Sequence, residues 1–124
     1  MSIQSFLVKQ EGQIQYVLLD VVTERGHFFC SLGVGYINNG DLHLSEVGQS
    51  ALNALADNTG AKKETVHFVE IATKNRATER VPQAFERAEP SDTVFFVCKD
   101  SAVYDAVFAQ LGFREQPHLG ASVQ

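Results

Sequence analysis

Residues 93–116 read TVFFVCKDSAVYDAVFAQLGFREQ. The nearly continuous apolar run at residues 93–99 predicts a buried strand, because a strand covered on both faces needs no polar alternation. Asp100 then has a side chain suited to capping a helix, and an apolar stripe at helical spacing follows it. The segment therefore predicts a strand, a helix and a last strand beginning at Phe113. The stripe consists of Tyr104, Val107, Phe108 and Leu111.

Upstream of this segment, helix and strand patterns alternate. Residues 65–73 alternate as a strand, with Val66, Phe68 and Glu70 on one face. Ser45 is suited to capping a helix that ends at Gly60, where glycine favours the left-handed conformation. Pro82 suits a first helical turn, so a shorter helix is predicted from there to about residue 89.

The first 44 residues predict β structure. Strands are expected at residues 3–9, 14–23 and 28–37, and a short return strand at 42–44. Asn38-Asn39-Gly40-Asp41 predicts a tight hairpin, because Asn-Gly tolerates the positive φ angles of such turns. We therefore expect one α/β domain over residues 1–118, with a mixed β-sheet whose N-terminal antiparallel strands are followed by α-β-α-β-α-β. Residues 119–124 are expected to be a flexible tail.

Composition narrows the classes of function. The 124 residues are 44% hydrophobic and 20% charged, which is ordinary for one globular domain. The net charge of -5 argues against a nucleic-acid partner, since affinity for phosphates comes chiefly from Lys and Arg. We expect neither secretion nor a membrane partner, because the sequence shows no secretory leader pattern and no apolar run of transmembrane length. Cys30 and Cys98 lie in apolar runs and are expected to be buried thiols, so a cytoplasmic protein is predicted.

The pattern in residues 93–116 resembles the closing strand, helix and strand of the GNAT acyl-CoA N-acyltransferases, including the ending Leu111-Gly112-Phe113. The same ending also fits an ordinary left-handed helix cap at Gly112. The resemblance implies a GNAT-like fold, acetyl-CoA as cofactor and a carboxylate base, for which Glu70 is the candidate.

The resemblance also implies that residues 74–81 take the place of the pyrophosphate loop, with Arg76 and Arg80 as cofactor-binding residues. This segment lacks the family's spaced glycines, and Phe108 stands where the family usually has a tyrosine acid. Residues 46–52 also resemble the end of such a loop, although only one of the two segments can fill that place. The expected protein is thus an acyltransferase or a degenerate, inactive relative.

Two other classes remain open. One is a non-catalytic module that binds or inhibits a partner protein, or pairs with a second copy. The other is a ribonuclease-H-like nuclease, in which Asp20, Glu46 and Asp100 stand at roughly the places of metal-binding carboxylates. No metal site is predicted from the four histidines, because they lack the close spacing of metal ligands: His27, His43, His67 and His118.

Overall fold

The apolar run that begins at Thr93 forms the strand around which the sheet is built. In the computed structural model, which describes residues 2–11, 14–60 and 65–111, β6 (Thr93–Cys98) has all six residues buried. It pairs in parallel with β3 (Gly26–Asn38) on one side and with β5 (Val66–Ile71) on the other. The predicted α/β fold with a mixed sheet is therefore confirmed.

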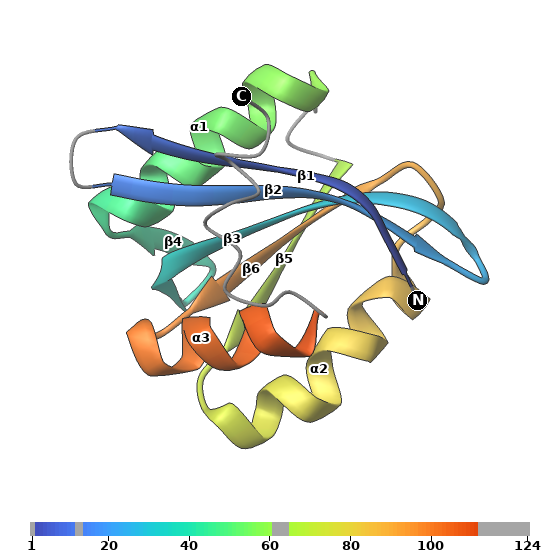
Figure 1. The fold of residues 1–124 in the computed structure, drawn as a ribbon. Helices are drawn as coiled ribbons and strands as arrows, with labels where there is room; N and C mark the ends of the chain where they lie inside the picture. The colour runs from blue at the N-terminus through green and yellow to red at the C-terminus, as the bar shows by residue number, and fades with distance from the viewer. Residues whose placement is uncertain (1, 12–13, 61–64, 112–124) are drawn as a thin grey trace.

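The N-terminal strands complete the sheet by antiparallel pairing. β1 (Ser2–Glu11) pairs with β2 (Ile14–Thr23), and β2 pairs with the first half of β3. β4 (Asp41–Leu44) returns along the end of β3. The described strands follow the order β1-β2-β3-β6-β5, with β4 attached to β3 outside this path (Figure 1). Among the described strands, β5 therefore lies at the edge of the sheet, and β6, which follows it in the chain, lies inside.

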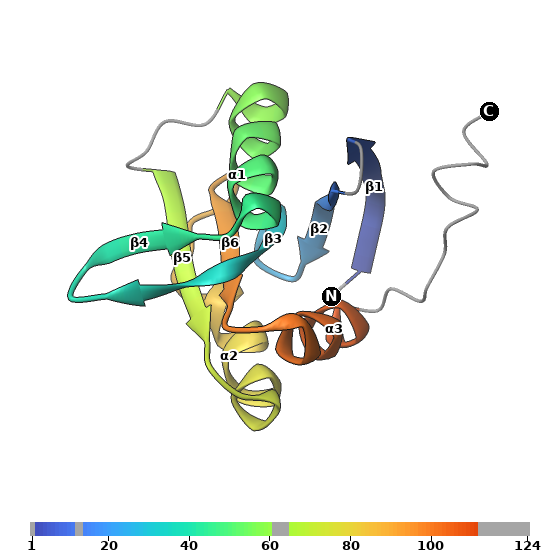
Figure 2. The same ribbon diagram turned by 90° about the vertical axis from the view of Figure 1, so that its left-hand side faces the viewer.

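Helices cover both faces of the sheet (Figure 2). α1 (Glu46–Thr59) packs on one face, over a cluster that includes Phe95 and Val97. α2 (Lys74–Arg87) and α3 (Ser101–Gln110) cover the opposite face, over a cluster that includes Phe96 and Ile71. The alternation predicted for β5 is confirmed, because Val66 and Phe68 contact the α1 cluster whereas Val69 and Ile71 belong to the other.

The predicted turn and capping residues have the expected roles. Asn39 and Gly40 have positive φ angles of 51° and 85° in the turn that joins β3 to β4. Ser45 Oγ accepts a hydrogen bond from Gly48 N at 3.2 Å, and Asp100 Oδ1 accepts one from Val103 N at 3.0 Å. Gly60 ends α1 in the left-handed conformation, with φ 64°.

The predicted start of the second helix at Pro82 is wrong, because α2 begins eight residues earlier, at Lys74. Thr73 caps it by accepting a hydrogen bond from Arg76 N at 3.2 Å. Pro82 therefore lies inside the helix, where its missing N–H cannot bond the carbonyl of Thr78. Gln110 of α3 donates to that carbonyl through Nε2 at 3.3 Å, so a neighbouring helix replaces the lost bond.

Both cysteines are fully buried, as predicted, and unpaired. Burial raises the pKa of the Cys98 thiol to about 12 and raises the pKa of Cys30 as well. None of the described helices is long and apolar enough to cross a membrane. The predicted cap at Gly112, the strand from Phe113 and the tail at residues 119–124 lie outside the described residues.

Two glycines allow α1 to lie close to the sheet. A Cβ added to Gly48 would overlap the carbonyl oxygen of Val34, and one added to Gly33 would lie 2.6 Å from the ring of Phe95. Gly48 belongs to the segment that resembles a phosphate loop. In the structure, the missing side chain of Gly48 lets the first turn of α1 contact β3.

We predict that Gly48→Ala lowers the free energy of unfolding by about 1–3 kcal/mol, the usual cost of overpacking. Helix propensity acts in the opposite direction, since alanine is favoured over glycine by about 1 kcal/mol at an exposed helical position. Urea denaturation would measure the change, with Gln83→Ala at an exposed position of α2 as control. A Gly48→Ala protein more stable than the parent would contradict the close contact.

Candidate functional site

An apolar groove of about 580 Å³ lies on the α1 face of the sheet. Its walls come from three elements: the β3–β4 hairpin, the side of α1 that carries Leu52 and Ala56, and the strand β5. Apart from Asp41, every lining residue is apolar or glycine, which is the usual character of a pocket that binds apolar groups. The lining residues are Ile37, Gly40, Asp41, Leu42, Leu52, Leu55, Ala56, Val66 and Phe68.

Glu70, the predicted base, lies beside this groove and on the same face of β5 as Val66 and Phe68. Its Oε2 accepts a hydrogen bond from the backbone N–H of Ile37 at 2.6 Å. β3 is longer than β6, and their pairing ends at Val34 and Cys98, so Ile37 lies beyond the end of β6. The Glu70 carboxylate thus bonds an N–H that β6 does not reach, and joins β5 to the base of the hairpin.

Arg76 and Arg80, the predicted cofactor-binding residues, lie elsewhere. Residues 74–81 were expected to form a loop, but they form the first two turns of α2, so the predicted loop is wrong. Arg76 is exposed and Arg80 is half-buried on this helix. Because α2 covers the sheet face opposite to α1, the two arginines and Glu70 are not brought together.

The three carboxylates of the nuclease hypothesis are not brought together either, because Asp20 lies far from the other two. Asp20 pairs in register with Phe29, whereas Asp100 follows Cys98, which pairs with Val34. Five strand positions correspond to about 16 Å, so Asp20 lies far from Asp100 along the sheet. Glu46, the first residue of α1, lies at the same end of the sheet as Asp100. Ser45 N donates a hydrogen bond to Val34 O at this end, and Val34 pairs with Cys98. Within residues 2–11, 14–60 and 65–111, no group of three His, Cys, Asp or Glu side chains is placed to hold a metal ion.

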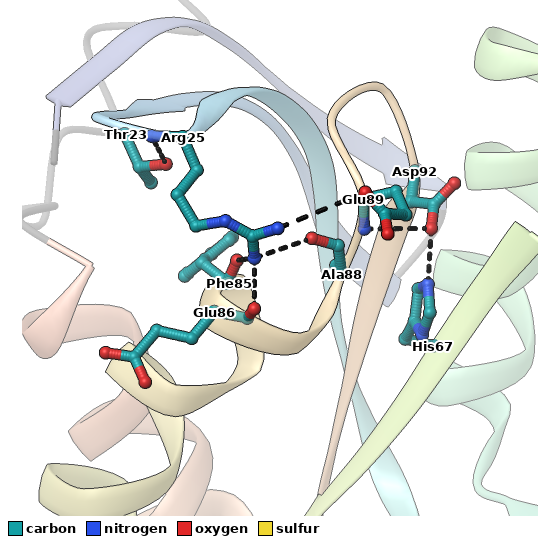
Figure 3. Close-up of polar contacts among 8 residues, drawn as sticks. All are labelled: Thr23, Arg25, His67, Phe85, Glu86, Ala88, Glu89 and Asp92. Atoms are coloured by element: carbon teal, nitrogen blue, oxygen red, sulfur yellow. Dashed lines mark hydrogen bonds and ion pairs between the residues drawn. The ribbon is translucent and has the colours of Figure 1, made fainter.

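A polar network lies at the other end of the sheet, where β5 and β6 begin (Figure 3). Arg25, in the turn between β2 and β3, donates through Nη1 to the carbonyls of Phe85 and Ala88, each at 3.0 Å, and to that of Glu86. These carbonyls belong to the last turn of α2, where helical partners are missing and positive charge is favoured. Arg25 therefore caps α2 from a distant part of the chain.

His67 and Asp92 form the second part of this network. His67 Nε2 lies 2.6 Å from Asp92 Oδ2, which also accepts a hydrogen bond from Glu89 N at 3.2 Å. The hydrogen bond from His67 lowers the pKa of the Asp92 carboxyl below its usual 3.8. The pair links the edge strand β5 to the loop before β6. A second pair, His27 and Asp20, joins β3 to β2 at 3.6 Å.

Sequence reasoning missed the groove and both of these pairings. His67 and Asp92 are 25 positions apart, and only the register of Val66 with Thr93 shows that they are neighbours. The groove depends on where β5 lies relative to the hairpin. The alternation of residues in β5 is the sequence signal that could have indicated one wall of the groove, since it places Val66, Phe68 and Glu70 on one face.

Comparisons with known proteins add no family to these observations. No protein-family model matches the chain, and no curated protein or solved structure matches it either.

We predict that Glu70→Ala lowers the free energy of unfolding by about 1–3 kcal/mol, because the Ile37 N–H loses its partner in a half-buried position. Glu70→Gln retains an acceptor oxygen and should lose less than Glu70→Ala. Chemical denaturation of the three proteins measures both changes. Equal stability of the parent and Glu70→Ala would show that the bond to Ile37 contributes nothing.

We also predict a pH-dependent effect of Asp92→Asn. Because the folded pKa of Asp92 is lowered, its stabilisation is complete above pH 3.8 and is lost as pH falls through the folded pKa. The difference in unfolding free energy between parent and variant should therefore shrink in acid. Denaturation at several pH values would measure it, with Asp105→Asn on the exposed side of α3 as control. A difference that stays constant down to pH about 2 would contradict the assignment.

Proposed function

We propose that this protein is a non-catalytic binding module whose groove takes up apolar side chains of a partner protein. The observation that carries the proposal is the groove itself, about 580 Å³ in volume and walled by apolar side chains of α1, the β3–β4 hairpin and β5. A recess of this kind is a usual binding site for apolar groups. Leu52, Val66 and Phe68 remain partly exposed along it, although each contacts the core below.

The positions of the candidate catalytic residues support a binding role. The Glu70 carboxylate is engaged by the Ile37 N–H, and Arg76 and Arg80 lie on the opposite face. An acyl-CoA-dependent acyltransferase needs its base and its phosphate ligands at one site, where they hold the amine and the acyl-CoA together. The two unpaired, buried thiols are typical of a reducing compartment, which supports the cytoplasm as the proposed location.

An acetyl-CoA-dependent N-acyltransferase is the second candidate. One observation favours it, namely that Glu70 lies next to the apolar groove, on the face of β5 that also carries Val66 and Phe68. A thermal-shift titration tests it, because a ligand bound only by the native state raises the melting temperature. Absence of a shift at high micromolar acetyl-CoA would remove this candidate. If a shift occurs, Glu70→Gln should retain it and abolish release of free CoA.

We predict that the groove binds the neutral fluorescent probe 1-aminoanthracene, and that Ala56→Phe prevents this by filling the groove from α1. Ala56 is exposed, so the larger ring should not disturb the core. Ala109→Phe, at an exposed position of α3, is the matched control and should bind the probe like the parent. Fluorescence titration measures binding. Lack of binding by the parent, or equal binding by Ala56→Phe, would refute the groove as a binding site.

A further inference from the structure

The outer edge of β5 carries main-chain groups with which none of the described strands pairs. β5 ends the order β1-β2-β3-β6-β5, and within the described part of the chain no strand pairs with its outer side. Lys99 N donates to Ile71 O at 3.3 Å, so the main chain of Ile71 points towards β6. Since N–H and C=O groups alternate in direction along a strand, those of Val66, Phe68 and Glu70 point outwards.

The same edge adjoins the groove. Val66 and Phe68 line the groove with their side chains, and their main-chain groups lie on this outer edge. An extended segment bonded to this edge would turn every second side chain towards the α1 face. Those side chains would lie beside Val66 and Phe68, beneath the tip of the hairpin, which projects beyond β5 in Figure 2. Main-chain bonds would then provide affinity, and the groove would select the side chains.

Charge restricts the kind of partner. Asp41 is the charged residue among those that line the groove, and it is exposed at the hairpin tip. The whole chain carries a net charge of -5. A segment with Lys or Arg beside Asp41 is therefore favoured, whereas a second copy would bring the same negative charge to the interface.

We propose that β5 accepts an extended segment of a partner protein as an added strand, with apolar residues at alternate positions and a Lys or Arg beside Asp41. The proposal rests on the proposed function, since it specifies the occupant of the same groove. It excludes a helical occupant, whose apolar residues would recur at every third or fourth position.

The test begins with a displayed library of random eight-residue peptides, selected on the folded full chain and counter-selected on Ala56→Phe. The selected peptides are expected to have apolar residues at alternate positions and a basic residue. The tightest is then synthesised in two forms, each N-methylated at one of the two alternating sets of amides. One form should bind about tenfold more weakly or worse, since it loses edge hydrogen bonds, and the other should bind about as well as the parent peptide.

Two variants test the protein's side of the contact. Val66→Pro removes an outward N–H and leaves the ladder to β6 intact, so it should weaken peptide binding about tenfold. Asp41→Asn should weaken binding about threefold and reduce its dependence on salt. Circular dichroism and thermal melts show whether each variant is folded, and the N-methylated peptides give the answer independently if Val66→Pro is not.

Three results would contradict the inference of an added strand. Selected peptides with helical spacing, or equal binding of both N-methylated forms, would leave the groove as a binding site but exclude an added strand. A dimer in light scattering that Val66→Pro dissociates would assign the edge to a second copy. Failure to select any peptide sensitive to Ala56→Phe would refute both the added strand and the proposed function.

Discussion

The complete burial of β6 is the constraint on which the rest of the structure depends. A strand with no exposed residue needs a layer of side chains on each face and a paired strand along each edge. α1 provides one layer, α2 and α3 provide the other, and β3 and β5 pair with β6 along its two edges. The ring of Phe95 lies against Gly33, and Gly48 approaches the same stretch of β3, so the close approach of α1 to β3 also helps to cover this side chain of β6.

Local patterns in the sequence predicted most of the elements, because their signals involve residues only a few positions apart. The Asn39-Gly40 turn, the capping residues Ser45 and Asp100 and the Gly60 cap are of this kind. The prediction that a helix begins at Pro82 is wrong because the cost of a proline inside a helix depends on tertiary structure. Proline at this position indicates a first turn only if nothing else satisfies the carbonyl of Thr78, and Gln110, 32 positions away, does so.

The candidate site was less predictable because it depends on strand order. Alternation placed Glu70 correctly on the face with Val66 and Phe68. Its bond to Ile37 was not predictable, since it requires β6 to lie between β3 and β5 and to end before β3 does. Arg76 and Glu70 are close in sequence, yet the strand end and Thr73 cap between them carry the chain from one face of the sheet to the other. Short separation in sequence was therefore a poor guide to a shared site.

The burial of the two cysteines has a practical consequence for following motions of this protein. A thiol reagent reacts with the thiolate, and both burial and the raised pKa suppress that form in the folded state. Cys30 lies in the first half of β3, whereas Cys98 ends β6 next to the cap of α3. The rate at which each cysteine becomes labelled thus reports how often its own part of the sheet opens. The chain therefore already contains two thiol probes of local opening, one within the central strand β3 and one at the end of the sheet where the helices begin.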